Sequence, residues 1–410
     1  MKLGAIADDL TGATDLSLIL SRAGFSVLQV VGVPDAADFG SADAVVVSLK
    51  SRTASVEDAV NQSVAAASAL RAAGAQQLYF KYCSTFDSTD QGNIGPVTDA
   101  LLDLLGVSGT IACPAFPANG RTVYQGHLFV GDRLLSESSM RDHPLTPMRD
   151  PDLVRVLGRQ SNRPVSLIPI ANVRADGLSD RFNEFDGIAI VDAVDDGDLL
   201  RIGKAAANLK LVTGGSGAAM GLPANFGAVA GNTPSLTWPS GKAVVLVGSC
   251  SKATLGQVDH YKALGAPALA IDPSSISSGA VTIEDAEAFV VQSPVGLPPL
   301  IYSSATPESV AAQQRQLGQM AAGEIVERFH AALAGRLLAH GFNRFIVAGG
   351  ETSGAVVGGL GVNALQIGPE IDPGVPWTRA VTSQGPLALA LKSGNFGTVD
   401  FFSKAWKLLV

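Results

Sequence analysis

The sequence predicts an α/β protein of two domains, each with a mainly parallel sheet, and a ligand crevice between them. Short apolar runs alternate with longer helical patterns, which is the rhythm of βαβ units. The 410 residues, 47% of them hydrophobic, are enough for two cores. Several apolar runs end in small or polar residues, as strands do where ligands bind at the carboxyl edge of an open parallel sheet.

The first apolar run, Leu3 to Ala7, is predicted to be a buried strand, and Asp8 and Asp9 follow it directly before a helix. Asp9 or Thr11 could simply cap that helix. A cap needs only one such residue, however, and this segment carries several. We therefore expect Asp8 or Asp9 to take part in the chemistry at the carboxyl end of the strand.

Strands and helices then alternate, with strands expected at 44–49, 77–80 and 110–113 and helices at 56–73 and 94–105. Polar residues follow each strand, and the carboxyl ends of neighbouring parallel strands lie on one edge of a sheet. We expect a pocket there for a small hydroxylated anion. Its predicted binding residues are Thr11, Gly12, Lys50, Arg52, Lys81, Ser84, Asn119 and Arg121, with Asp87 as a third candidate for the catalytic base.

Beyond this region the chain is predicted to be irregular from 124 to 152, and a loop of that length suits a lid. Strand-like runs at 165–169, 187–191 and 209–212 are expected to complete the first sheet. A linker rich in proline, serine and glycine spans 224–242. The predicted domains are therefore residues 1–223 and 243–410.

The second domain is expected to have strands near Ala243, Ala268, Leu300 and Phe345, and an amphipathic helix over 307–340. Its predicted strands at 243–247, 345–348 and 387–391 each end in a loop of small residues. Such loops allow the backbone to approach a ligand, and a helix that starts there presents N–H groups to an anion. Thr352 or Ser353 is the expected N-cap of one such helix.

A phosphate is the natural ligand for these loops, which are expected to share one crevice. No segment reads G-x-x-x-x-G-K-[ST], and the nearest approach to G-x-G-x-x-G, at Gly215, fails at its third glycine. The nucleotide site is therefore neither a P-loop nor a standard dinucleotide fingerprint. The residues of these loops that could contact a phosphate are Ser249, Ser251, Gly349, Gly350, Glu351, Thr352, Ser353, Gly354, Gly394 and Asn395.

The overall charge of −8 argues against nucleic acid or an anionic membrane as a general partner. The cysteines Cys83, Cys113 and Cys250 are odd in number and far apart, which favours a reducing cytoplasm over a disulfide framework. Asp8 and Asp9 interrupt the first apolar segment too early for a signal peptide. Prolines and glycines break the uncharged stretch from 211 to 241, so it is not expected to span a membrane.

A cluster of charged residues in one domain and three glycine and serine loops in the other are the parts that a small-acid kinase requires. A 2-hydroxy-acid dehydrogenase would also have two α/β domains, but it should carry the missing dinucleotide fingerprint. A non-catalytic sugar-acid sensor would need the first pocket without the loops of the second domain. Both remain alternatives to a kinase.

The chain also resembles the four-carbon acid sugar kinases over essentially its whole length. The resemblance rests on the motifs Ile6 to Ala13, Gly92 to Gly95, Ala118 to Arg121, Gly248 to Ser251, Gly349 to Gly354 and Ser393 to Asn395. The segments 81–89 and 140–148 look like the 3-oxo-tetronate kinase branch, whereas threonate and erythronate kinases tend to be shorter in the first of them.

This resemblance implies that an N-terminal domain binds the sugar acid and a C-terminal domain binds ATP. By the same resemblance, ATP contacts Ser249 or Ser251, the Gly349 to Gly354 loop and Gly394. It also implies phosphorylation of the terminal C4 hydroxyl, with Mg²⁺ as the accompanying ion, and D-threonate or D-erythronate as alternative substrates. Metal ligands are not assigned by it, and neither is the catalytic base. The expected partners are the small acid and ATP, and a homodimer stays open.

Overall fold

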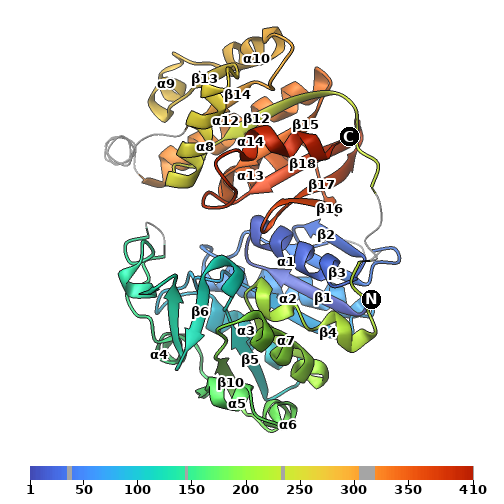
Figure 1. The fold of residues 1–410 in the computed structure, drawn as a ribbon, viewed down its shortest axis with the longest axis vertical. Helices are drawn as coiled ribbons and strands as arrows, with labels where there is room; N and C mark the ends of the chain where they lie inside the picture. The colour runs from blue at the N-terminus through green and yellow to red at the C-terminus, as the bar shows by residue number, and fades with distance from the viewer. Residues whose placement is uncertain (35–38, 144–145, 232–235, 304–318, 410) are drawn as a thin grey trace. The chain divides into compact units, whose positions relative to one another are not determined.

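The computed structural model describes residues 1–34, 39–143, 146–231, 236–303 and 319–409. The chain divides into two compact units, Met1–Pro234 and Ser235–Val410. Figure 1 colours the first unit from blue to yellow-green and the second from yellow to red, and helices pack along a sheet in each. The predicted α/β fold class with mainly parallel sheets is confirmed.

The first unit contains a parallel sheet with the strand order β2-β3-β1-β4-β11-β5-β10-β9. Central strands such as β1 and β3 are buried along their whole length, because a parallel sheet is covered on both faces and its strands read as continuous apolar runs. The strands are β1 Leu3–Ala7, β2 Val27–Val31, β3 Ala44–Ser48, β4 Gln77–Lys81, β5 Gly109–Cys113, β9 Val165–Ile168, β10 Gly187–Val191 and β11 Leu211–Gly214.

The connections in the first unit create a switch point between two neighbouring strands. From β1 the chain passes through α1 to β2 on one side, whereas from β4 it passes through α3 to β5 on the other side. Ligands of open α/β sheets bind outside the strand ends at such a point. The helices of this unit are α1 Leu10–Arg22, α2 Val56–Ala72, α3 Ile94–Leu105, α4 Leu153–Gln160, α5 Ile170–Val173, α6 Leu178–Asn183 and α7 Asp196–Ala205.

Part of the segment predicted to be irregular is in fact a small antiparallel sheet. It consists of β6 Arg121–Tyr124, β7 His127–Val130 and β8 Arg133–Leu134. These strands are two to four residues long and only partly buried, so they lack the alternation by which a strand is recognised in a sequence. Pro144 and Leu145 of the expected lid lie outside the described residues.

The second unit has the strand order β13-β14-β12-β15-β18-β17-β16. The neighbouring strands β13, β14, β12, β15 and β18 run parallel to one another. Strand β17 is antiparallel to both of its neighbours, β18 and β16. Neither β16 nor β17 was predicted from the sequence. The strands are β12 Lys242–Val247, β13 Ala268–Ala270, β14 Leu300–Tyr302, β15 Phe342–Ala348, β16 Ala364–Asp372, β17 Val375–Thr382 and β18 Gly385–Lys392.

The second sheet also has a switch point, between β12 and β15. The chain leaves β12 towards β13 on one side and leaves β15 towards β16 on the other. The helices are α8 Lys252–Ala263, α9 Pro273–Ser278, α10 Ile283–Gln292, α12 Gln319–Ala339, α13 Gly350–Gly359 and α14 Phe401–Lys404. The helix expected over 307–340 corresponds to α12, and its predicted first part lies outside the described residues.

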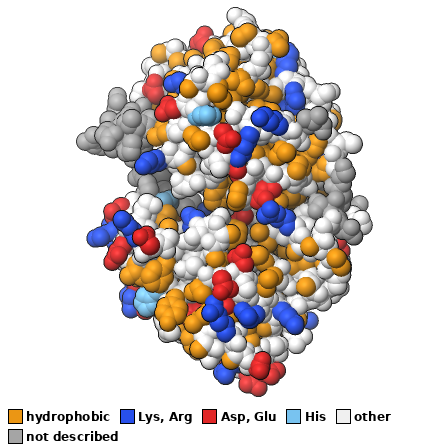
Figure 2. Space-filling model, in the orientation of Figure 1, with side chains coloured by type: hydrophobic (Ala, Val, Ile, Leu, Met, Phe, Trp, Pro, Cys, Tyr) orange, Lys and Arg blue, Asp and Glu red, His pale blue; other side chains and the backbone are white. Residues whose placement is uncertain are grey.

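The surface carries both signs of charge. Figure 2 shows Lys and Arg side chains interspersed with Asp and Glu on the face drawn, without a continuous basic area. Among the described helices, none combines the length and apolar character needed to cross a membrane.

Candidate functional site

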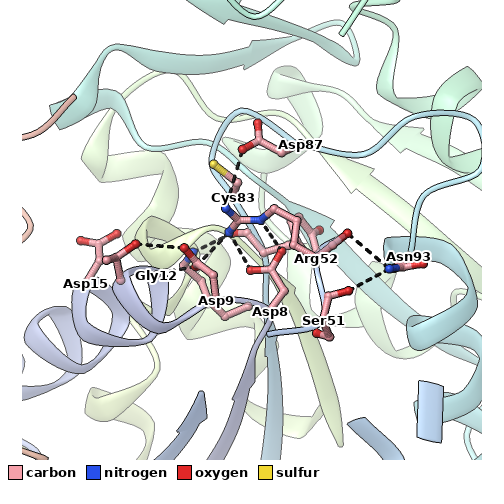
Figure 3. A network of polar contacts seen from close by, with 12 residues as sticks. Asp8, Asp9, Gly12, Asp15, Ser51, Arg52, Cys83, Asp87 and Asn93 are labelled. Atoms are coloured by element: carbon pink, nitrogen blue, oxygen red, sulfur yellow. Dashed lines mark hydrogen bonds and ion pairs between the residues drawn. The ribbon is translucent and has the colours of Figure 1, made fainter. Parts of the chain in front are cut away.

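The switch point of the first unit brings three carboxylates around one guanidinium group. Arg52 donates two hydrogen bonds of 2.8 Å to Asp8, from Nε to Oδ2 and from Nη2 to Oδ1. Its Nη2 also lies 2.9 Å from Oδ1 of Asp9, and its Nη1 lies 3.8 Å from Oδ2 of Asp87. Figure 3 shows Arg52 lying between these carboxylates, which follow β1 and β4 in the chain.

Asp9 has a structural role as well as its ion pair. It is the N-cap of α1, and its Oδ1 accepts a hydrogen bond from the N–H of Gly12 while Oδ2 accepts one from Thr11. A Cβ at Gly12 would come within 2.2 Å of the Asp9 carboxylate and 3.0 Å of Lys81 Nζ. Glycine is therefore required here, because the two charged groups occupy the space that any larger residue needs.

The neighbouring aspartates differ in their affinity for protons. Burial raises the pKa of Asp8 above its ordinary value, although Arg52 opposes this effect. For Asp9, burial acts in the same direction, but Arg52, Lys81 and the hydrogen bonds from Thr11 and Gly12 outweigh it and lower the pKa. The two carboxylates in turn hold the pKa of Arg52 well above its usual range, despite burial. The cluster is therefore an ion network.

Asp87 is the least occupied carboxylate of the three. Its Oδ1 accepts a hydrogen bond of 2.6 Å from Thr85, whose hydroxyl also lies 3.0 Å from Cys83 Sγ. Its Oδ2 lies 3.8 Å from Arg52 Nη1 and has no closer hydrogen-bond or ion-pair partner among the described residues. Burial raises the pKa of Cys83 to about 12, so this thiol is not a nucleophile at neutral pH.

The remaining predicted acid-binding residues differ in their exposure to solvent. Lys81 is 3% exposed and donates a hydrogen bond of 2.7 Å to the Tyr82 carbonyl. Ser84 is partly buried in the loop after β4, while Lys50 is exposed after β3. The guanidinium of Arg121 donates to the Asn119 carbonyl. Asn119 Nδ2 and Arg121 Nε are buried and have no hydrogen-bond partner among the described residues.

Asn93 fixes the loop that carries Arg52, and it was not among the site residues predicted from the sequence. Its side-chain amide donates to the carbonyls of Ser51 at 2.8 Å, Arg52 at 3.3 Å and Ala54 at 3.0 Å. Figure 3 shows this amide beside the loop. Only the motif Gly92 to Gly95 pointed to this position, and no local pattern says that its partner lies some 40 residues earlier in the chain.

In the second unit, the three small-residue loops meet at the carboxyl edge of the sheet. They follow β12, β15 and β18, which are adjacent and parallel in that order. Added Cβ atoms show how closely the loops touch. One at Gly394 would lie 2.4 Å from Ser249 Oγ, and one at Gly248 would lie 2.1 Å from Thr352 Oγ1.

The prediction that Thr352 or Ser353 caps the helix after β15 is wrong. α13 begins at Gly350, its N-cap is Gly349, and no side chain caps it. Gly349 has φ +126°, a conformation that other residues rarely adopt, so the chain turns directly from strand into helix. Thr352 and Ser353 lie in the first turn and are buried. The uncapped N–H groups leave room for an anion.

The third loop is anchored through the Gly394 carbonyl. This oxygen accepts hydrogen bonds from Ser251 Oγ at 2.5 Å and from Thr254 Oγ1 at 2.7 Å. Ser251 is also the N-cap of α8, so one hydroxyl joins the first loop to the third. Asn395 follows Gly394 directly.

Lys392, the last residue of β18, was not among the predicted site residues. It is fully buried, and its Nζ donates to Thr254 Oγ1 at 3.0 Å, to the Ser393 carbonyl at 3.1 Å and to the Gly394 carbonyl at 3.3 Å. Burial lowers the pKa of Lys392 to about 7. A lysine in front of Ser393 and Gly394 was visible in the sequence, but its burial was not.

Two family models match this chain. A model described as a sugar-binding N-terminal domain matches residues 3–222, and one described as a nucleotide-binding C-terminal domain matches residues 244–402. The first covers the carboxylate cluster, and the second covers the three small-residue loops.

Several relatives match over nearly their full length and are named 3-oxo-tetronate kinase. The protein of Burkholderia multivorans is 54% identical, with 99% of this chain and 97% of the relative covered. That of Cupriavidus necator is 52% identical with the same coverage. That of Pectobacterium atrosepticum is 47% identical and covers 99% of both chains.

Two solved structures share the fold of the whole chain. A Salmonella typhimurium protein, provisionally described as a tRNA synthase, is 44% identical with a TM-score of 0.86, and the match covers 98% of both chains. A Haemophilus influenzae protein is also 44% identical, with a TM-score of 0.80 and coverage of 99% of this chain and 100% of the other.

Proposed function

Because this chain belongs to the four-carbon acid sugar kinase family, we propose that it is a 3-oxo-tetronate kinase that transfers the γ-phosphoryl group of ATP to the C4 hydroxyl. Its relatives of that name are 54% and 52% identical over 99% of this chain. The structural observation that carries the proposal is the convergence of three small-residue loops at the switch point of the second sheet.

We assign the acid to the cluster at the switch point of the first sheet. Asp87 is the proposed base that accepts the proton of the C4 hydroxyl. Its Oδ1 accepts a hydrogen bond from Thr85, but its Oδ2 has only the 3.8 Å contact with Arg52, whereas both oxygens of Asp8 and of Asp9 accept hydrogen bonds. Both oxygens of Asp8 accept from Arg52, and both oxygens of Asp9 are used by the cap and by Thr11. Asp8 and Asp9 remain the alternative bases.

For Arg52 we propose another main role than the predicted contact with the substrate carboxylate. Its Nε and Nη2 are occupied by Asp8 and Asp9, so the substrate carboxylate can reach it only through Nη1. We propose that Arg52 mainly orients the three carboxylates. Lys81 keeps the region from being strongly negative, which favours the approach of an acid.

We assign the nucleotide phosphates to the N–H groups at the start of α13 and to the loops around Ser249 and Gly394. Among the described residues, no group of three or more His, Cys, Asp or Glu is arranged to hold a metal ion. This fits a Mg²⁺ ion held mainly by the phosphates, because Mg²⁺ needs only one or two carboxylates besides them. When bound, the ion would neutralise charge on the transferring group.

The test is an assay of the purified protein for ATP-dependent ADP release with 3-oxo-tetronate, D-threonate and D-erythronate. We expect the highest kcat/KM with the 3-oxo acid. A preference for threonate or erythronate would establish the alternative substrate, and NAD⁺ reduction would indicate a dehydrogenase. The net charge of −8 and the mixed charges in Figure 2 do not favour a tRNA partner.

We place this reaction in the cytoplasm. Cys83, Cys113 and Cys250 are all free thiols in the structure, as expected under reducing conditions. ATP is also available there.

A further inference from the structure

Lys392 joins the third of the loops assigned to the nucleotide to α8, the helix that follows the first loop. Its ammonium group contacts Thr254 of α8 as well as the carbonyls of Ser393 and Gly394. The Gly394 carbonyl thus accepts from Lys392, Ser251 and Thr254 together. In a trans peptide the following N–H points opposite to the carbonyl, so the N–H of Asn395 points away from these three donors.

We propose that Lys392 is a positioning residue for ATP, which fixes the Gly394–Asn395 peptide and takes up a proton from solvent when the nucleotide binds. This inference rests on the proposed function, because it requires phosphates at these loops. Lys392 is buried, so the proposal has it act through the Gly394–Asn395 peptide and not by direct contact with the nucleotide.

Two opposing effects set the protonation of Lys392. Burial favours the neutral amine and lowers the pKa to about 7. The three oxygen atoms around Nζ favour the ammonium form, because a neutral amine has only two N–H groups to donate. A polyphosphate bound nearby adds negative charge and shifts this balance towards the ammonium form.

The elements packed around Lys392 offer little competing charge. Its partner in β15 is Ala348, and the nearby part of β17, from Val375 to Trp377, is apolar. The first turns of α8 and α13 carry Lys252 and Glu351, and both side chains are exposed. The lowered pKa of Lys392 is therefore due to its burial.

The experiment is isothermal titration calorimetry of Mg²⁺-ATP in the absence of the acid. It is run from pH 6 to pH 8 in buffers of different ionisation enthalpy, which report proton uptake. For the wild type we expect net uptake near pH 7, and a Kd about 10-fold weaker at pH 8 than at pH 6, since one protonation is linked to binding.

Three variants complete the test. Lys392→Met should bind ATP more weakly at pH 6 and show neither the uptake nor the pH dependence. Lys392→Arg keeps the charge at every pH, so it should bind without proton uptake. Lys242→Met is the control and should behave like the wild type. Lys242 is the first residue of β12, at the end of the strand away from the small-residue loop, and its ammonium group lies over the Phe342 ring. Circular dichroism without ATP checks that each variant is folded.

The outcomes separate this inference from the proposed function. If the wild type binds no ATP, the proposed function is wrong. If it binds ATP but Lys392→Met and Lys392→Arg take up the same fraction of a proton as the wild type, Lys392 is not the linked group and the inference is overturned.

Discussion

Arg52 and Asp8 form a bidentate ion pair with both hydrogen bonds at 2.8 Å, although their positions are 44 residues apart in the chain. The same guanidinium contacts Asp9 at 2.9 Å and lies 3.8 Å from Asp87. One cation therefore offsets the mutual repulsion of three carboxylates at a strand edge. This explains how so many acidic groups can be gathered where an acid is proposed to bind.

Arg52→Ala is expected to destabilise the fold by about 2–4 kcal/mol, because it leaves buried carboxylates without their counterion. This loss is smaller than the roughly 3–5 kcal/mol for breaking a fully buried ion pair, because the Arg52 side chain is 22% exposed. Urea unfolding measures it. Arg159→Ala, which breaks an exposed pair with Asp90, should cost less than about 1 kcal/mol. Adding Asp8→Asn to Arg52→Ala should recover part of the loss, and no recovery would argue against the ion network.

Asp87→Asn is expected to lower kcat by about 10²–10⁴-fold, because it removes the proposed base and keeps the shape of the side chain. The Kd of ATP should not change. Asp9→Asn is the matched comparison, since asparagine caps a helix about as well as aspartate. Its Tm should fall only modestly, because the variant keeps the cap but loses the charge that pairs with Arg52. If Asp9→Asn loses turnover and Asp87→Asn keeps it, the base is Asp9.

Gly394→Ala is expected to weaken ATP binding by at least about 10-fold, which corresponds to roughly 1.4 kcal/mol. The added methyl group would lie 2.4 Å from Ser249 Oγ, so the first and third loops would be forced apart. Gly358→Ala in α13 is the control, because its Cβ would meet open space and alanine favours a helix. Equal ATP affinity in both variants, measured by calorimetry, would mean that these loops do not bind the nucleotide.

Lys392→Met is also expected to change the pH dependence of stability without ATP. Burial lowers the pKa of Lys392 to about 7 in the folded chain, whereas an ordinary lysine has a pKa of 10.5. Between these pH values the unfolded chain binds more protons than the folded chain, so the free energy of unfolding rises with pH. The buried lysine therefore destabilises the fold most below pH 7 and least near pH 10. The Tm of the variant relative to the wild type should therefore fall as the pH rises from 7 to 10. A constant difference would show that Lys392 is protonated throughout.

The sequence by itself determined the fold class and the strand ends at which functional groups gather. Continuous apolar runs such as 44–48 and 243–247 became buried parallel strands, because such strands are covered on both faces. The small-residue loops after 243–247 and 345–348 could also be recognised in the sequence. Glycine and serine directly after an apolar run indicate such a loop without information on distant contacts. Both features are local in the sequence.

The tertiary structure decided which of these residues meet and which oxygens remain available. Arg52 was predicted to hold the substrate, and this stays a prediction, but the structure adds that its Nε and Nη2 already bind Asp8 and Asp9. The cap of α13 is Gly349 rather than Thr352 or Ser353, because a backbone conformation with φ +126° replaces a side-chain cap. The amine of Lys392 is buried and contacts Thr254 of α8. Pairings across long stretches of chain depend on how the sheet is assembled, and no local pattern encodes them.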